Sequence, residues 1–220
     1  MAIPKPKTLV LCSGGIDSVT LAARAASERE LVTIMAFDYG QINVRELDFA
    51  AGIAKKLKVP FKLVDLGAIA KMLRRPHDEG SPAREITADF PNRNTIMFSI
   101  AWGYASRIGA DAVGIAVQGD EQDRHAQNRP AFIKAFEKME ERAFEGEVGI
   151  EMYAPFLYRS KAAVIKDAIE LGVNLENTWS CQLGGKKHCG ECSACQRRRR
   201  AFIEAEVDDP TDYAATPPLD

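Results

Sequence analysis

The stretch that decides the fold reads Thr8-Leu-Val-Leu-Cys-Ser-Gly-Gly-Ile-Asp-Ser18, and an Ala-rich segment, 19–26, follows it. The apolar residues 9–12 predict a short buried strand, and the Ala-rich segment predicts a helix. The residues between them form a tight turn, in which Gly14 and Gly15 can adopt backbone angles that other residues avoid. This arrangement lets a ligand approach the main chain closely.

The turn has the features of a phosphate-binding loop. Its N–H groups and those that open the following helix point into one concavity, where the helix dipole favours an anion. Ser13 and Ser18 add hydroxyl donors. Asp17 would repel phosphates unless it caps the helix or holds Mg²⁺ between itself and them. A Gly-Gly turn alone also occurs in plain strand–turn–helix units, and the Gly-Lys-Ser/Thr of the common P-loop is absent. With both serines and the aspartate in place, the pattern favours phosphate binding.

Length and composition are those of a globular α/β protein. The 220 residues are enough for one α/β domain with a small appendage, and 46% hydrophobic and 27% charged residues are ordinary values. The net charge of −2 provides no basic field for nucleic acid or membranes, and the basic run 197–200 is read as a solvated helix face. No apolar stretch approaches the roughly 20 residues that span a bilayer, and residues 1–7 lack the apolar core of a signal peptide. We therefore expect a cytoplasmic location.

Strands and helices alternate along the chain. This repetition predicts a parallel sheet with right-handed crossovers, and we expect a five-stranded, doubly wound α/β fold. The segment 67–93 reads as irregular, which is typical of a lid or binding loop. The helix at 95–107 is apolar almost all round, which favours burial in the domain or a homodimer contact. The later strands are expected at 31–37, 61–66, 112–117 and 148–153, and the other helices at 43–58, 131–144, 160–171 and 194–206.

Several polar residues are expected on one rim, because ligands of such sheets bind at the carboxyl ends of the strands. Asp38-Tyr39-Gly40-Gln41 follows the second strand and could meet a nucleotide or a second substrate, although a plain polar turn is the alternative. The unusually long loop 118–129 follows the fourth strand. Arg93, at the entrance of a helix, is placed to bind a phosphate or carboxylate bidentately. Lys161 lies in the first turn of a helix, where the dipole disfavours a cation, and this indicates a role on an anionic ligand.

Four of the five cysteines crowd into residues 181–195. Two residues separate Cys189 from Cys192 and Cys192 from Cys195, and seven separate Cys181 from Cys189. Four converging thiolates suit tetrahedral Zn²⁺, and a filled shell leaves no open position, so the site would be structural. An iron–sulfur cluster, also built on four cysteines, is the alternative. Adjacent residues rarely both bind one metal, so we leave His188 out of the ligand set.

These motifs occur in one order that resembles the 7-cyano-7-deazaguanine synthase family of the ATP pyrophosphatase, or PP-loop, superfamily. The likeness covers about residues 7–205. It is carried by the loop 13–18, residues 38–41, Arg93 with Asn94, Pro155 with Lys161, and the four cysteines.

The resemblance implies an ATP-dependent carbon–nitrogen ligase. ATP, bound with Mg²⁺, would adenylate the carboxylate of 7-carboxy-7-deazaguanine, and ammonia would displace AMP to form an amide. A second ATP would activate the amide oxygen, and loss of AMP would leave the nitrile. Asp17, Arg93 and Lys161 would be the catalytic residues, acting by positioning and charge stabilisation.

The resemblance also implies the binding residues. The nucleotide would be bound by Ser13, Gly14, Gly15, Asp17, Ser18, Asp38, Tyr39, Gly40 and Gln41. The second substrate would be bound by Asn94, Glu121 and Arg129, and zinc by Cys181, Cys189, Cys192 and Cys195. The expected domains are an ATP-binding α/β domain (1–172), a zinc knuckle with the C-terminal helix (173–206) and a flexible tail (207–220).

The chain departs from the family pattern where the deazaguanine and ammonia are expected to bind. Ile42 and Asn43 stand where the family usually has a basic residue and a His, and 121–129 keeps an acid and the Arg of the family loop. Three interpretations therefore stay open. The chain is a synthase with an altered pocket, a paralogue that passes the acyl adenylate to another amine such as one on a protein partner, or a non-enzymatic zinc-knuckle module that binds RNA through 197–200 or an adenylate. The intact phosphate loop argues against the last.

Overall fold

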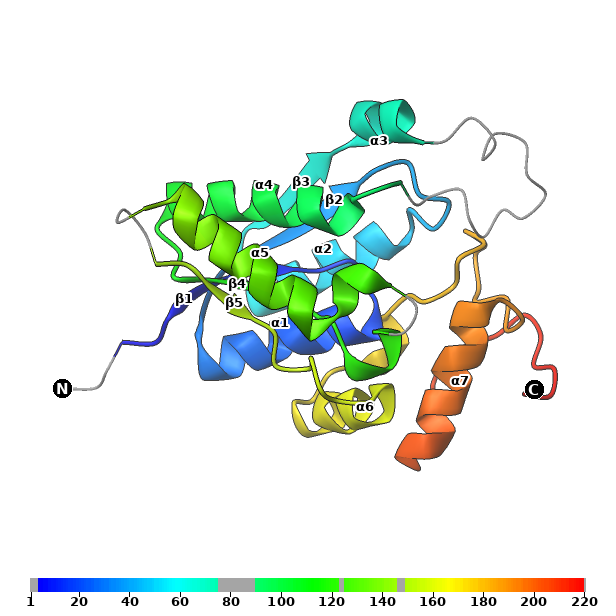
Figure 1. Cartoon of the computed structure of the whole chain (residues 1–220). Coiled ribbons are helices and arrows are strands. Elements are labelled where there is room, and N and C mark those ends of the chain that lie inside the picture. The colour runs from blue at the N-terminus through cyan, green and yellow to red at the C-terminus, as the bar shows by residue number, and fades with distance from the viewer. Residues whose placement is uncertain (1–3, 75–89, 123–124, 146–148, 220) are drawn as a thin grey trace.

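The computed structural model describes residues 4–74, 90–122, 125–145 and 149–219. Its strands form one parallel sheet in the order β3-β2-β1-β4-β5 (Figure 1). The prediction of a five-stranded parallel α/β fold is confirmed. The strands are β1 (Lys7–Leu11), β2 (Glu30–Asp38), β3 (Phe61–Asp65), β4 (Ala112–Gly114) and β5 (Glu151–Tyr153).

The helices differ most from the sequence prediction at two places. The second begins at Glu46 rather than residue 43, because the N–H groups of Glu46 and Leu47 bond to the carbonyls of Asn43 and Val44 in a preceding turn. The segment 67–93 was expected to be irregular, but its start is helical, with Ala70 buried against the core; residues 75–89 lie outside the described residues. The helices are α1 (Ile16–Glu28), α2 (Glu46–Leu57), α3 (Gly67–Leu73), α4 (Arg93–Ile108), α5 (Pro130–Ala143), α6 (Lys161–Glu170) and α7 (Ser193–Ala205). Among the described residues, no helix combines the length and apolar character that crossing a membrane requires.

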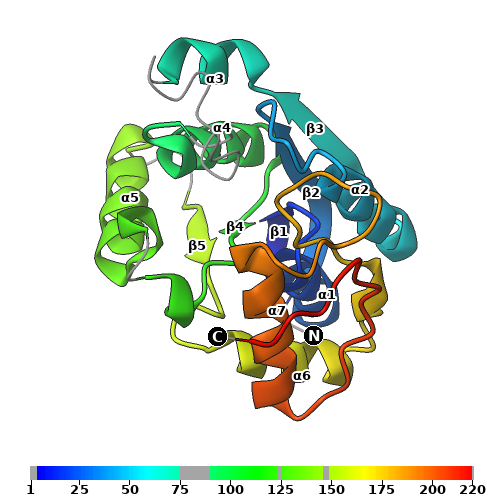
Figure 2. The same cartoon turned by 90° about the vertical axis from the view of Figure 1, so that its right-hand side faces the viewer.

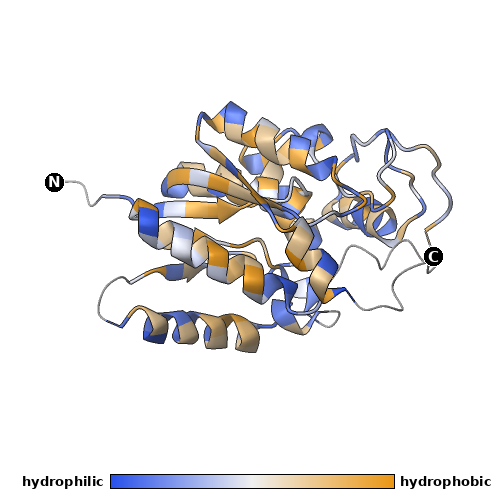
Figure 3. Ribbon diagram, turned by 90° about the horizontal axis from the view of Figure 1, so that it is seen from above, coloured by the Kyte–Doolittle hydropathy of each residue, from blue (hydrophilic) through white to orange (hydrophobic). Residues whose placement is uncertain are grey.

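Two hydrophobic cores lie on opposite faces of the sheet. Neighbouring strand residues point to opposite faces, so Leu9 and Val10, both fully buried, enter different cores. The Val10 core contains residues from α1, α2, α6 and α7, and the Leu9 core contains residues from α3, α4 and α5. Figure 2 shows α4 and α5 on one side of the strands and α1 and α6 on the other. The buried strands are mostly apolar along their length (Figure 3), as expected for a sheet covered on both faces.

The turn between β1 and α1 is tightly packed at Gly14. Its backbone lies in the left-handed region, with φ +91°, and a Cβ atom there would overlap the carbonyl oxygen of Glu46 in α2. The carbonyl of Gly14 accepts a hydrogen bond from the N–H of Trp179 at 2.9 Å. The turn is therefore fixed from two sides, by α2 and by the segment that leads to the cysteines.

The C-terminal tail is not loose, contrary to the sequence prediction. The N–H groups of Ala214 and Ala215 donate to the carbonyls of His188 and Cys189. Arg198 of α7 is fully buried and donates to Thr211 in the tail at 2.7 Å. Its guanidinium also bonds to Thr178 and to the carbonyl of Leu175. A buried cation needs this many acceptors, and the tail supplies part of the set, which composition alone could not reveal.

We expect Gly14→Ala to lower the free energy of unfolding by about 2–5 kcal/mol. The left-handed backbone costs a residue with a Cβ about 1–2 kcal/mol, and a clash inside packed structure costs about 1–3 kcal/mol. Urea denaturation followed by circular dichroism would measure the change. Gly52→Ala in α2 is the matched control, because a Cβ there meets nothing within 4 Å; it should raise the stability by roughly 0.5–1 kcal/mol. Equal effects of the two substitutions would contradict the packing argument.

Candidate functional site

The candidate site is a cavity of about 240 Å³ at the carboxyl ends of the central strands. The chain passes from β1 towards β2 and β3 on one side of the sheet and reaches β4 and β5 on the other, so β1 and β4 flank the point where the strand order reverses. Ligands of open α/β sheets bind at this point. The ends of β1, β2 and β4 supply the apolar wall, which is formed by Leu11, Cys12, Met35, Ala36, Phe37, Ile115, Ala116 and Val117.

The phosphate loop borders this cavity. Ser13 and Ser18 line it, and their hydroxyl oxygens lie 3.3 Å apart. Gly15 is the N-cap of α1, and the first N–H groups of a helix have no partner within that helix. The loop therefore offers the Ser13 hydroxyl and a helix N-terminus to an anion, the arrangement that phosphate-binding turns use, while the Ser18 hydroxyl donates to the carbonyl of Gly15.

Asp17 and Lys161 form an ion pair between the starts of two helices. Lys161 Nζ donates to Asp17 Oδ2 at 2.6 Å, and both side chains are largely buried. Lys161 opens α6, where Ser160 accepts the N–H of Ala163 as the predicted N-cap. Asp17 Oδ1 is buried without a hydrogen-bond partner among the described residues. The lysine thus reaches the turn between β1 and α1, although neither it nor Asp17 lines the cavity, and its role on an anionic ligand stays a prediction.

The residues after β2 shape the loop more than they line the cavity. Tyr39 lines the cavity, whereas the Asp38 carboxylate accepts the N–H of Gly40. Gln41 is buried, with its amide bonded to Phe37 O and to the N–H of Tyr39. Arg74, which the sequence reasoning did not include, donates to the carbonyls of Tyr39 and Gly40. The loop is thus held by its own polar side chains and by Arg74, which directly follows α3.

The opposite wall is formed by α4 and the loop after β4. Arg93 lines the cavity, and its guanidinium lies over the Tyr39 ring, 5.5 Å from the ring centre. Asn94 donates to Asn128, which donates to Glu121, and all three line the cavity. Asn94 and Glu121, which the sequence predicted to bind the second substrate, thus both line the cavity, and that they bind it stays a prediction.

Arg129 is placed differently from the prediction. It is exposed, its Nε donates to the Gln122 carbonyl, and Asn128 occupies the cavity wall instead. The reason is local: residues 126–128 form a single 3₁₀ turn, which directs Asn128 inward and Arg129 outward. Since neighbouring positions of a short turn look alike in sequence, the register could not be read from the pattern.

Glu46 is a cavity residue that the sequence reasoning missed. Its carboxylate lines the cavity and accepts hydrogen bonds from Gln41 at 3.3 Å and Asn43 at 2.7 Å. Burial raises the pKa of Glu46 from 4.5 to about 7, although these two hydrogen bonds and the charge of Arg93 act in the opposite direction. The signal in the sequence was an acidic residue in the first turn of the helix that follows Gln41.

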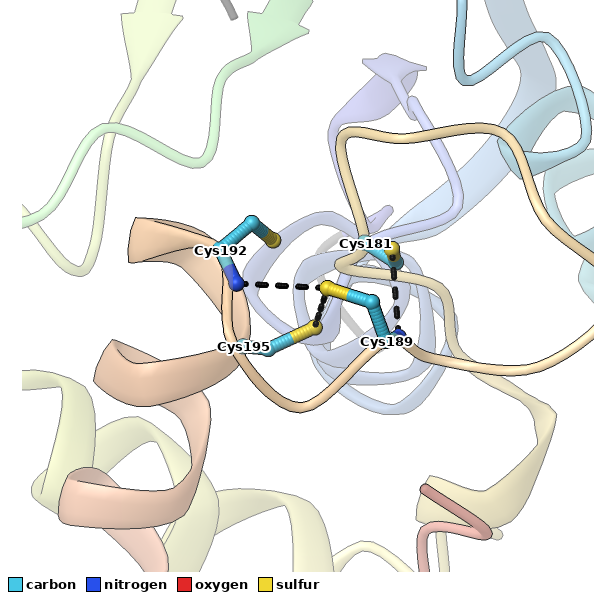
Figure 4. Close-up of side chains that lie close together, drawn as sticks. All are labelled: Cys181, Cys189, Cys192 and Cys195. Carbon is cyan, nitrogen blue, oxygen red and sulfur yellow. Dashed lines mark hydrogen bonds between the residues drawn. The ribbon is translucent and has the colours of Figure 1, made fainter. Parts of the chain in front are cut away.

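The four cysteines converge on one point (Figure 4). Their sulfur atoms all lie within 4.8 Å of one another. The sulfur of Cys189 accepts the N–H of Cys192 at 3.2 Å, and that of Cys181 accepts the N–H of Cys189 at 3.4 Å. Backbone N–H groups directed at sulfur stabilise thiolates, the form that binds metals. The predicted ligand set is therefore brought together at the start of α7.

His188 is not part of this set. Its Nε2 accepts the N–H of Ser180 at 3.0 Å, and its ring packs on Trp179, with 4.3 Å between the ring centres. Burial lowers the pKa of His188 to about 4, so the imidazole is neutral and able to accept that bond. The histidine supports the knuckle as a packed core residue, in agreement with its exclusion from the predicted ligands.

The fold and the site define a class of protein: a parallel α/β protein with a phosphate-loop turn at the switch point and a four-cysteine knuckle beside it. The chain belongs to the family described as queuosine biosynthesis protein QueC, whose model matches residues 7–206. The 7-cyano-7-deazaguanine synthase of Agrobacterium fabrum is 45% identical over 216 residues, covering 94% of this chain and 92% of the relative. That of Brucella ovis is 42% identical, covering 94% and 93%.

Solved structures support the same fold. The U34-tRNA thiolase NcsA of Methanococcus maripaludis matches with a TM-score of 0.54 and 13% identity, covering 91% of this chain and 66% of that one. NMN synthetase of Francisella tularensis matches with a TM-score of 0.54 and 12% identity, covering 94% and 79%. At such low identity these matches concern the fold alone.

Glu46 should make stability depend on pH in a defined direction. A carboxyl group whose pKa is higher in the folded than in the unfolded protein stabilises the fold most below its unfolded pKa. The contribution of Glu46 should therefore be complete below pH 4.5 and be lost as the pH rises to about 7. Urea unfolding of the wild type and of Glu46→Gln across this range would show the difference. Parallel curves for the two proteins would contradict a buried titrating carboxyl group.

Proposed function

We propose that this protein is a 7-cyano-7-deazaguanine synthase that uses ATP and ammonia to convert a carboxylic acid into a nitrile. ATP would adenylate the carboxylate of 7-carboxy-7-deazaguanine and release pyrophosphate. Ammonia would displace AMP to form the amide, and a second ATP would activate the amide oxygen so that loss of AMP leaves the nitrile. Relatives with this name match nearly the whole chain, and the comparisons give the paralogue interpretation no support.

One observation carries the proposal: the phosphate loop and the cavity at the switch point adjoin each other. Ser13 and Ser18 belong to both. A nucleotide whose phosphates lie on the loop would therefore present its α-phosphate to an acid held in the cavity. Such adjacency supplies the positioning that makes formation of an acyl adenylate fast.

The cavity walls suit a flat heterocycle with polar edges. Apolar side chains such as Met97 and Phe98 line it beside the strand ends and would pack against ring faces. The linked side chains of Asn94, Asn128 and Glu121 would bond to the polar edge of the ring system. Arg93 would bind the substrate carboxylate or the α-phosphate and offset the charge that develops there.

Mg²⁺ fits beside the phosphate loop. Asp17 has one oxygen paired with Lys161 and a second, buried one without a hydrogen-bond partner among the described residues. A carboxylate oxygen is the ligand type that Mg²⁺ takes together with phosphate oxygens. Asp17 would hold the ion, which when bound neutralises phosphate charge, while Lys161 orients Asp17 and adds positive charge.

Zn²⁺ fits the four cysteines. A tetrahedral zinc with bonds of about 2.3 Å holds its sulfurs about 3.8 Å apart, and those of Cys189 and Cys195 are 3.9 Å apart. An iron–sulfur cluster places several atoms between its thiolates and needs a wider cage. We assign the ion a structural role, because four sulfurs fill its shell. A cytoplasmic location would keep these thiols reduced, and homodimer formation stays a prediction.

Purified protein incubated with ATP, ammonium and 7-carboxy-7-deazaguanine tests the proposal directly. We expect mass spectrometry to detect the nitrile, with AMP and pyrophosphate formed in step with it. AMP release that depends on an added protein amine, with no nitrile formed, would overturn the proposal. Binding of RNA without any AMP release would overturn it as well.

Replacing Asp17 should abolish nucleotide chemistry while preserving the fold. We expect Asp17→Ala to lower acid-dependent pyrophosphate release by about 100-fold or more, because a charge-stabilising group at the reacting phosphates is lost. Circular dichroism should remain that of the wild type. Asp48→Ala is the matched control, because Asp48 is also an acidic residue in the first turn of a helix but lies in α2, outside the turn between β1 and α1. Comparable losses in both variants would contradict the role of Asp17.

Removing one thiolate should affect the metal and the fold together. We expect Cys192→Ser to reduce bound zinc, measured by elemental analysis, and to lower the thermal unfolding midpoint, because metal binding contributes to folding free energy. Cys12→Ser is the matched control, since Cys12 is also buried but lies in the cavity wall. Full zinc content in Cys192→Ser would contradict the assigned ligand set.

A further inference from the structure

The cavity contains a carboxylate that the proposed chemistry has not yet used. Within the described residues, Glu46 and Glu121 are the two acidic side chains that line it. Glu121 is bonded to Asn128 on the wall formed by the loop after β4. Glu46 lies on the other side, at the start of α2, where its backbone packs directly against Gly14 of the phosphate loop. The two acids therefore face different parts of a bound substrate.

The location of Glu46 matches the point of nucleophilic attack. The acyl carbon of an adenylate is attached to the α-phosphate, so it must lie where the phosphate loop meets the cavity. Glu46 is the cavity acid adjacent to that loop, and Ser13 and Ser18 line the same cavity. An amine that attacks the acyl carbon would thus pass close to the Glu46 carboxylate.

The Glu46 carboxylate is oriented and still has acceptor capacity. Gln41 donates to Oε1 and Asn43 donates to Oε2, both from the loop after β2. A carboxylate can accept about four hydrogen bonds, so two positions are left for a ligand in the cavity. Since Gln41 is itself buried and bonded to Phe37 O, the amide that holds Glu46 is fixed in place.

Resting on the proposed function, we propose that Glu46 binds the ammonium ion and acts as the general base that makes it nucleophilic. The ammonium donates one proton to the carboxylate, and the resulting lone pair on nitrogen attacks the acyl carbon. The new C–N bond forms as the C–O bond to AMP breaks, and AMP leaves with that electron pair. The excess proton on the amide nitrogen and the proton on Glu46 pass to solvent, so the carboxylate is restored for the next turnover.

The surroundings of Glu46 are consistent with this role. A base works best when its pKa lies near the working pH, and burial raises that of Glu46 to about 7. The charged and titratable groups that face it are Arg93 from α4 and Cys12, which directly follows β1. Arg93 stabilises the ionised carboxylate, and burial raises the pKa of Cys12 to about 11, so the thiol is neutral in this range.

Two partial reactions separate this role from substrate binding. The first is exchange of pyrophosphate into ATP, which needs 7-carboxy-7-deazaguanine but no ammonium. The second is amide formation from the adenylate at fixed total ammonium. For Glu46→Gln we expect exchange to stay within about twofold of the wild type, and amide formation to fall by about 100- to 10,000-fold.

Hydroxylamine provides a readout that a structural role would not move. It is already neutral at mildly alkaline pH, so it needs no base before attack. Hydroxamate formation by Glu46→Gln should therefore approach the wild-type rate. Glu140→Gln is the matched control: Glu140 is a buried glutamate bonded to Ser99, outside the cavity, and this variant should retain amide formation.

The wild type also allows a test that depends on no variant. At fixed total ammonium, amide formation should rise with pH and level off above about pH 7, as Glu46 ionises. A wild-type rate that keeps rising with free ammonia well beyond that pH would overturn the inference. For the folded Glu46→Gln variant, either unchanged amide formation or a loss of pyrophosphate exchange would overturn it as well. Absence of exchange in the wild type would instead overturn the proposed function, and the inference with it.

Discussion

The close packing of the Gly14 backbone is the constraint on which the site depends. On one side the turn touches the start of α2, where a side chain at position 14 would overlap the carbonyl of Glu46. On the other side its carbonyl accepts the N–H of Trp179. One residue without a Cβ thus brings together the phosphate loop, the helix that carries Glu46 and the segment that leads into the cysteine knuckle.

This arrangement gives the knuckle a part in the architecture of the site. The Trp179 ring stacks on Phe49 of α2, with 5.7 Å between ring centres, and its Nε1 donates to the carbonyl of Cys181. The first cysteine is therefore coupled through one tryptophan to the phosphate loop. The buried guanidinium of Arg198 and the docked tail complete this region. A metal ion held by the four thiolates would stiffen the base on which the phosphate loop is held.

The sequence predicted the fold well, because its signals were local and repeated. The alternation of apolar strands with helical segments indicated the parallel sheet, and the spacing of the cysteines indicated their convergence. It predicted the irregular regions less well. The helix at Gly67–Leu73 was missed because a single buried residue, Ala70, leaves little periodicity to read. The tail was expected to be loose because its Asp and Pro content hides the contacts that Thr211 and Tyr213 make with α7 and His188.

The site shows the same division between local and distant information. The sequence by itself determined the glycine turn before α1, the polar turn after β2 and the convergence of the four cysteines, because each is a short motif whose residue types and spacing carry its structure. Only the tertiary structure decided that Lys161 pairs with Asp17, that Asn128 rather than Arg129 faces the cavity, and that Glu46 lies beside the phosphate loop. The positions of Lys161 and Glu46 bring together residues from different elements, and the orientation of Asn128 depends on the register of one turn. How the helices pack on the sheet decides all three, and no pattern along the chain reveals them.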